Sequence, residues 1–210
     1  VWREPTLKHI KIMMKKILIC VFSGTGNTRK IANLFSDEFI KNGVETTIVD
    51  IKKGARIKCV DDFDAVGVCY PIHGFNAPYN VLEFAYDMPK THDKPLFVLN
   101  NVSSYKLVSI LKEKGYDYFA EYHYVMPYNM IFRHDDAAAY KMWHTAKNLA
   151  PVEAREILSL TPHKLKKIPF GYLIALLFRI EHHAMKVNGR FFKVDMEKCV
   201  NCGLCVKSCP

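Results

Sequence analysis

The sequence predicts an α/β domain built on a five-stranded, doubly wound parallel sheet, followed by a cysteine-rich segment. Short apolar segments rich in Val, Ile, Phe and Tyr alternate with amphipathic patterns of helical period along the first 130 residues. A glycine-rich turn directly follows the first apolar segment. Strands that alternate with helices form right-handed βαβ units, which give a parallel sheet covered on both faces.

The expected strands are separated by stretches that mostly carry a helical stripe. The strand patterns fall at 16–22, 44–50, 64–70, 95–100 and 118–126. The first helix carries Ile31, Leu34, Phe35 and Phe39 on one face and is expected to stop at Asn42-Gly43. The connection 51–63 is short, so we expect that crossover to lack a full helix.

The turn after the first strand has the composition of a phosphate-binding loop. It reads Ser23-Gly24-Thr25-Gly26-Asn27-Thr28. The glycines let the backbone turn tightly towards an anion, which the amides and the dipole of the following helix would stabilise. The loop lacks the GK[ST] of nucleotide triphosphate loops and the spacing of G-x-G-x-x-G. A turn with a purely structural role is the alternative, although it would need only one glycine and a cap.

Four cysteines near residue 210 have the spacing of a bacterial ferredoxin cluster run, C-x2-C-x2-C-x3-C-P. Cys199, Cys202 and Cys205 can hold three corners of one iron–sulfur cluster, while the fourth cysteine of such a run, Cys209, ligates another cluster. A second run would complete the set, so we interpret the sequence as a truncated product or an incomplete gene. Structural zinc is the alternative, but its cysteine pairs are usually further apart.

These two motifs carry a family resemblance. The loop S-G-T-G-N-T after a first parallel strand resembles the FMN phosphate loop of flavodoxins, and this resemblance covers about residues 15 to 130. Together with the cysteine run, the sequence resembles the EFR-type family, in which a flavodoxin-like domain is fused to a two-cluster ferredoxin domain. The resemblance implies FMN and 4Fe-4S clusters as cofactors. The second cysteine run of that family is absent here.

Two further loops are expected beside the phosphate loop, because ligands of doubly wound sheets bind beyond the carboxyl ends of the strands. The resemblance to flavodoxins implies that both flank the flavin ring. The first loop comprises Tyr70, Pro71, Ile72, His73, Gly74 and Phe75, and the second comprises Asn100, Asn101, Val102 and Ser103. Tyr70 and Phe75 could equally pack at the rim, and His73 could be a surface histidine. The tryptophan usual in flavodoxins is absent, so the stacking partner stays open.

We expect four segments along the chain. They are a disordered or mis-started extension at 1–13, a flavodoxin-like domain at 14–135, a helical connector at 136–190 and the first part of a ferredoxin domain at 191–210. In the connector, one helix should begin at Ala137 and a second should carry Pro151 in its first turn. The apolar run 168–180 is too short to span a bilayer and is expected to dock against the protein. A membrane-surface helix is the less favoured alternative.

Charge is unevenly distributed. Residues 141–210 carry 12 Lys and Arg against 5 Asp and Glu, whereas residues 14–140 carry 15 of each. The basic part could steer an acidic redox protein partner. No zinc finger, helix-turn-helix or RNA-binding signature accompanies the lysines, so nucleic acid is not expected. Residues 1–13 hold no secretory pattern, and a reducing cytoplasm is therefore the expected location.

The sequence thus predicts an FMN- and iron–sulfur-dependent electron carrier or oxidoreductase. A flavin exchanges one or two electrons and a cluster exchanges one, so the pair would convert between the two modes. No general base or nucleophile is identified, and electron transfer needs none. Two alternatives stay open: a flavin reductase that uses NAD(P)H or quinone, and a regulatory module with a flavodoxin fold and no cofactor.

Overall fold

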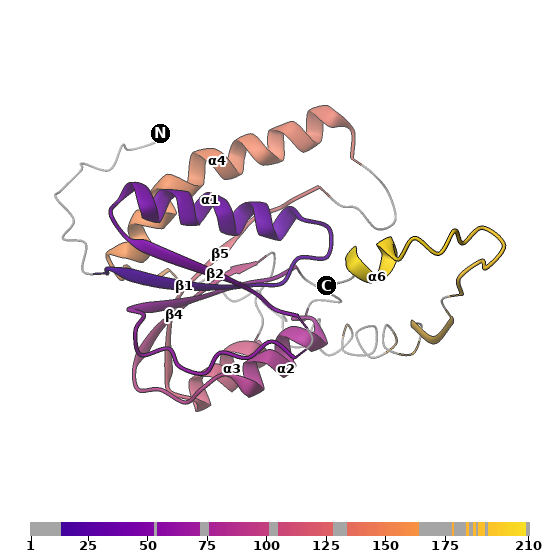
Figure 1. Cartoon of the computed structure of the whole chain (residues 1–210). Coiled ribbons are helices and arrows are strands. Elements are labelled where there is room, and N and C mark those ends of the chain that lie inside the picture. Colours follow the sequence, from indigo (N-terminus) through magenta and orange to yellow (C-terminus); the bar gives the residue numbers. More distant parts are fainter. Residues whose placement is uncertain are drawn as a thin grey trace.

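The computed structural model describes residues 14–52, 54–71, 76–100, 105–127, 134–163, 178, 184, 187, 189–191 and 193–208. Its main body is one parallel sheet with helices on both faces (Figure 1). The strands are β1 (Lys16–Val21), β2 (Glu45–Asp50), β3 (Ala65–Cys69), β4 (Lys94–Asn100) and β5 (Tyr116–His123). The helices of the body are α1 (Asn27–Lys41), α2 (Tyr79–Asp87), α3 (Tyr105–Glu113) and α4 (Asp136–Leu158).

The strand order β2-β1-β3-β4-β5 confirms the expected fold class. All four pairings are parallel, with Lys16 opposite Glu45 and Ile17 opposite Ala65 across the two sides of β1. This is the flavodoxin-like order of doubly wound sheets, which reverses between β1 and β3. The sheet therefore has its switch point where the glycine-rich loop leaves β1.

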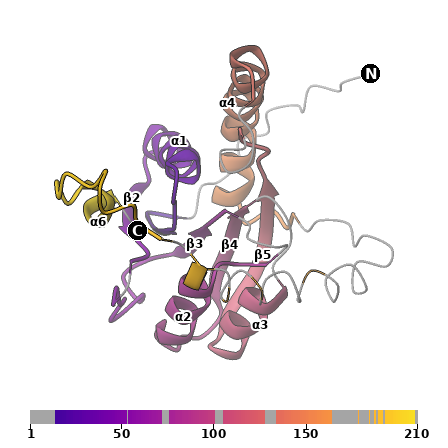
Figure 2. The same ribbon diagram turned by 90° about the vertical axis from the view of Figure 1, so that its right-hand side faces the viewer.

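Both faces of the sheet are buried, because successive side chains of a strand point to opposite sides. In β1, Ile17, Ile19 and Val21 belong to the core on one face, while Leu18 and Cys20 belong to the core on the other. Helices α1 and α4 cover the first face, and α2 and α3 cover the second (Figure 2). Cys20 and Cys69 are free thiols with no exposed area in these two cores.

Helix α1 follows from its sequence. Ile31, Phe35 and Phe39 are buried on one side of it, as the helical stripe predicts. The helix ends at Lys41, and Gly43 takes a φ of +80°, a left-handed conformation that glycine adopts without strain. Between β2 and β3 the described residues form turns and extended chain without a helix, as expected from the short connection.

Helix α4 corrects the expectation of two helices joined at Pro151. It is continuous from Asp136 to Leu158, with Pro151 inside it. A proline in a helix interior costs about 3 kcal/mol. Its stripe of buried residues stays in phase across the proline, and packing of that stripe offsets the lost hydrogen bond. The stripe comprises Ala146, Ala150, Ala154, Ile157 and Leu158.

Helix α4 packs into the core of the body. The buried residues of α4 belong to the core that α1 and the sheet share, so the α/β body extends to this helix. Beyond it, His163 pairs in parallel with Ala120 at the free edge of β5. The expected docking helix at 168–180 lies outside the described residues, apart from Phe178. Among the residues that the structure describes, no helix has both the length and the apolar character to cross a membrane.

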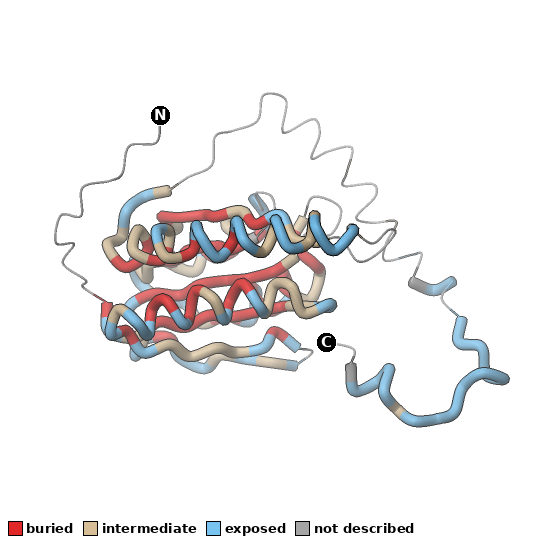
Figure 3. Tube along the Cα trace, turned by 90° about the horizontal axis from the view of Figure 1, so that it is seen from above, coloured by how far each residue is buried: buried red, intermediate tan, exposed pale blue. Residues whose placement is uncertain are grey.

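The end of the chain differs from this body. It contains the 3-10 turn η1 (Gly189–Phe191) and the short helix α6 (Leu204–Ser208). In the range 193–207 every residue is exposed except Gly203, which is half-buried (Figure 3). The apolar side chains Val194, Met196, Val200, Leu204 and Val206 are 65–83% exposed. The described part of this segment therefore has no core of its own.

Candidate functional site

The glycine-rich loop leaves β1 at the carboxyl edge of the sheet and enters α1. Phe22 follows the strand and donates its main-chain N–H to the carbonyl of Cys69 at 2.9 Å, which fixes the start of the loop against β3. Gly26 is the N-cap of α1, with a φ of +90°, and as a glycine it supplies no capping side chain of its own. The first amides of a helix have no partner within it and carry its positive dipole end, so this turn presents N–H groups suited to an anion.

The loop has room for such an anion. A Cβ atom added at Gly24 or Gly26 would meet no other atom within 4 Å. Ser23 and Gly26 are half-buried, and Gly24 and Thr25 are exposed. The Ser23 hydroxyl oxygen accepts the main-chain N–H of Arg29 at 3.2 Å, and its own proton stays available as a donor. The donor set and the open space therefore fit a phosphate group.

Asn27 ties this loop to a distant part of the chain. Its side-chain amide donates to the carbonyl of Pro127 at 3.0 Å, across a separation of 100 residues. Pro127 lies just after β5, so the contact joins the phosphate loop to the chain that leaves the last strand. We expected Asn27 to contact the cofactor directly. In the structure one of its amide hydrogens is used to hold the loop in place.

An ion pair that the sequence analysis did not identify lies beside the loop. Arg29, in the first turn of α1, pairs with Asp50 at the carboxyl end of β2. The Nζ atom of Lys52 lies 4.0 Å from the other carboxylate oxygen of Asp50. The two residues are 21 positions apart in the sequence, and the parallel pairing of β1 with β2 brings the end of β2 beside the start of α1.

The two loops expected to flank the flavin ring are described only in part. Tyr70 is 1% exposed and packs in the core under α2 and α3, which suits rim or core packing rather than an open ring face. Pro71 is half-buried and Asn100 is the last residue of β4. The remaining expected residues lie outside the described residues, and these are Ile72, His73, Gly74, Phe75, Asn101, Val102 and Ser103.

Tyr105 is a further aromatic residue at this edge of the sheet. It is the first residue of α3 and is 60% exposed. The buried residues of α3 are Leu107, Ile110 and Leu111, so Tyr105 is not part of its buried face. An exposed aromatic ring directly after the second flanking loop can pack against a planar ligand.

The three described cysteines of the cluster run are exposed free thiols at Cys199, Cys202 and Cys205. Asn201 and Gly203, between them, have φ values of 54° and 68°. These left-handed positions turn the chain sharply, and Asn and Gly are the residues that tolerate them best. Cys209 lies outside the described residues. Within the described ranges, no three His, Cys, Asp or Glu side chains are gathered as a metal site.

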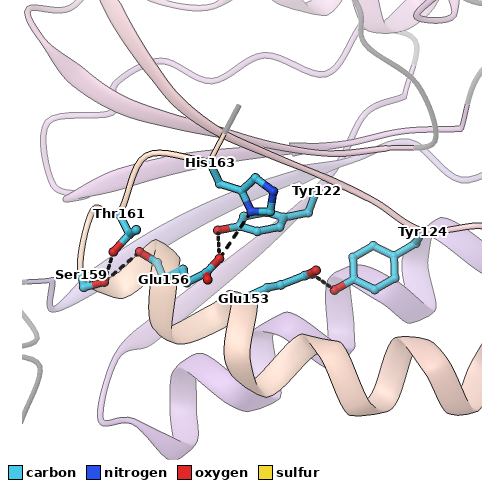
Figure 4. A network of polar contacts seen from close by, with 7 residues as sticks. All are labelled: Tyr122, Tyr124, Glu153, Glu156, Ser159, Thr161 and His163. Carbon is cyan, nitrogen blue, oxygen red and sulfur yellow. Dashed lines mark hydrogen bonds and ion pairs between the residues drawn. The ribbon is translucent and has the colours of Figure 1, made fainter. Parts of the chain in front are cut away.

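A polar network lies between β5 and α4, on the face of the sheet that α1 also covers (Figure 4). Tyr122 donates to the Glu156 carboxylate at 2.9 Å, and His163 Nδ1 lies 3.4 Å from the same carboxylate oxygen. Tyr124 donates to the carboxylate of Glu153. Burial raises the pKa of Glu153 above its ordinary value, while its hydrogen bond with Tyr124 acts in the opposite direction. The network fastens α4 and residue 163 to the last strand.

Comparisons with known proteins agree with the two parts of the chain. Residues 192–210 match the family model described as a 4Fe-4S binding domain. No curated protein matches the chain. The ferredoxin-type segment expected from the cysteine spacing is thus confirmed, whereas membership of the EFR-type family stays a prediction.

Comparison with solved structures found flavodoxins. A cysteine-to-serine mutant of flavodoxin from Pseudomonas aeruginosa is 16% identical, with a TM-score of 0.49, over 69% of this chain and 97% of that one. The two-electron reduced flavodoxin of Megasphaera elsdenii is 19% identical, with a TM-score of 0.46, over 66% and 98% of the two chains. The fold assignment itself stands on the strand order and the parallel pairing of this chain.

Proposed function

We propose that this chain is an electron-transfer protein that binds FMN at the carboxyl edge of its sheet and iron–sulfur clusters at its cysteine run. The open, glycine-rich turn between β1 and α1 is the observation that carries the proposal. It offers main-chain donors and open space at the switch point of the sheet, where doubly wound folds bind their ligands. The match of residues 192–210 to a 4Fe-4S binding domain supports the second cofactor.

In this proposal the chain's own residues bind and orient. The amides from Gly24 to Thr28 and the hydroxyls of Ser23 and Thr25 hold the phosphate, and Asn27 keeps the loop against Pro127. The loops at 70–75 and 100–103 flank the ring, with Tyr105 as an additional contact. Cys199, Cys202 and Cys205 hold one cluster, and Cys209 reaches another. When bound, the flavin and the clusters supply the electron transfer itself.

The proposed domain organisation follows the packing. Residues 14–163 form the flavin-binding body, and residues 191–210 form the first part of a ferredoxin domain, joined by the intervening connector. A redox protein is the partner. Its recognition by the basic region 141–210 would weaken as salt rises.

The test is anaerobic purification of the full chain, followed by addition of FMN and separate reconstitution with iron, sulfide and excess thiol. We expect one tightly bound FMN per chain, quenched in fluorescence, and an iron–sulfur absorbance that the C199S, C202S and C205S variants lose. A chain that stays colourless with both cofactors would overturn the proposal. Rapid bleaching of the bound flavin by NAD(P)H alone would favour a flavin reductase.

A further inference from the structure

We propose that Arg29 is a cationic phosphate-binding group which Asp50 holds back, so that Asp50 limits the affinity of the loop for the FMN phosphate. This inference rests on the proposed function. It assigns a role to two residues that lie outside the S-G-T-G-N-T motif, and it makes the charge at the end of β2 a determinant of cofactor affinity.

Arg29 is joined to the phosphate loop through its own backbone. Its main-chain N–H donates to the Ser23 hydroxyl oxygen at 3.2 Å, and it lies two residues after Asn27, the first residue of α1. This bond fixes the backbone at Arg29 relative to the loop while its long side chain can change rotamer. The backbone of Arg29 is therefore held within one helical turn of the loop that is proposed to bind the phosphate.

The ion pair that occupies Arg29 is partly solvated. The side chain of Arg29 is 30% exposed and that of Asp50 is 45% exposed. Exposed ion pairs contribute little to stability, because water and salt screen them and side-chain entropy opposes them. A phosphate dianion carries more charge than a carboxylate and accepts a guanidinium in the same two-pronged geometry. A bound phosphate can thus compete with Asp50 for Arg29.

Asp50 would keep a partner after such an exchange. Lys52 Nζ lies 4.0 Å from Asp50 Oδ2, whereas Arg29 contacts Oδ1. Lys52 is the more exposed of the two cations and can move closer as Arg29 leaves. The exchange therefore leaves neither Asp50 nor Arg29 unpaired, which removes the largest cost of breaking an ion pair.

The direction in which D50N changes the affinity for FMN separates this role of Asp50 from a structural one. If Arg29 and Asp50 only brace the loop, removing either partner loosens it and weakens FMN binding. If Asp50 holds Arg29 back, D50N frees the guanidinium, removes a negative charge near the phosphate and strengthens binding. R29Q weakens binding in both cases, so D50N is the decisive variant.

The experiment titrates the full chain and its variants with FMN and with riboflavin, which lacks the phosphate. We expect D50N to bind FMN about threefold to fivefold more tightly and R29Q about fivefold to tenfold more weakly, with riboflavin affinity unchanged. R29K should recover part of the loss because it restores the charge. In the R29Q background, D50N should give little of its gain.

E45Q is the matched control. Glu45 is the first residue of β2, the strand that Asp50 ends, and it pairs with Lys16 of β1 at 3.3 Å. E45Q therefore changes the net charge by the same amount at the end of the strand away from the loop. We expect its FMN affinity to equal that of the wild type. Equal or weaker FMN binding by D50N, or an undiminished D50N gain in the R29Q background, would overturn the inference and leave the proposed function standing. A wild-type chain that binds no FMN would overturn both.

Discussion

The α/β body and the cysteine segment of this chain are stabilised in different ways. Phe39 in the body has no exposed area and packs edge to face against Phe35 and Phe97. Phe191, just before the segment, is 74% exposed. The body therefore holds its shape through side chains buried on both faces of a sheet, whereas 193–208 has the composition of a segment that a metal cluster organises. Loss of a buried side chain should therefore destabilise the body, whereas loss of a cluster ligand should affect only the cysteine segment.

The largest expected effect is at the cysteines. C202S should abolish incorporation of iron and sulfide into the reconstituted chain, because it removes a thiolate from a set of three. The free energy of unfolding of the body should stay within about 0.5 kcal/mol of wild type, because Cys202 is exposed and distant in sequence from the core. Iron analysis and urea unfolding measure the two quantities. A clear loss of body stability in C202S would show that the body and the cysteine segment are not stabilised separately.

Two single substitutions of phenylalanine test the packing of the α/β body. F39A should lower the free energy of unfolding by about 3–5 kcal/mol, because it leaves a cavity among buried aromatic rings. F191A should change it by less than about 0.5 kcal/mol, since an exposed side chain has little packing to lose. Chemical denaturation followed by far-UV circular dichroism compares them. Equal losses in the two variants would show that Phe191 packs as firmly as Phe39.

A smaller effect is expected in the phosphate loop. T25A should weaken FMN binding by about 1–2 kcal/mol, because it removes one hydroxyl donor to a charged phosphate. T91A serves as the control, since Thr91 lies before β4 at the opposite edge of the sheet. Fluorescence titration with FMN measures both. Unchanged affinity in T25A would remove this hydroxyl from the site.

The smallest expected effect is a change in how the free energy of unfolding depends on pH. Burial raises the pKa of Glu153 in the folded state, so the fold binds a proton there more tightly than the unfolded chain does. Stability from this group is fully present below its unfolded pKa and is lost as pH rises through its folded pKa. E153Q should flatten that decline while keeping an acceptor for Tyr124, and Y124F should steepen it. Urea unfolding between pH 4 and pH 7, a range around ordinary carboxyl pKa values, measures the slopes, and parallel curves would contradict the assignment.

The sequence predicted the sheet because its strands are buried on both faces and therefore read as continuous apolar runs. It also predicted the end of α1 at Asn42-Gly43, since that signal is local. It missed the continuity of α4 through Pro151, because the stripe from Ala146 to Leu158 gains its packing energy only in the folded core.

The candidate site divides in the same way. The glycines of the loop are a local signal of a tight turn and were found directly. The Arg29–Asp50 pair and the Asn27–Pro127 bond join positions far apart in sequence, which no local pattern encodes. Tyr70 was expected near the ring from its position after β3, but the alternation of a strand turns its side chain into the core.

The hydrogen bond from Asn27 to Pro127 also has a consequence for folding during synthesis on the ribosome. Its two ends are made a hundred residues apart, so the anchor for the turn does not yet exist while the first three strands emerge. At a synthesis rate of about 5–20 residues per second, that interval lasts about 5–20 seconds. The nascent chain can form its early strands in that time, but the hydrogen bond that holds the glycine-rich loop can form only after β5 and Pro127 have been made.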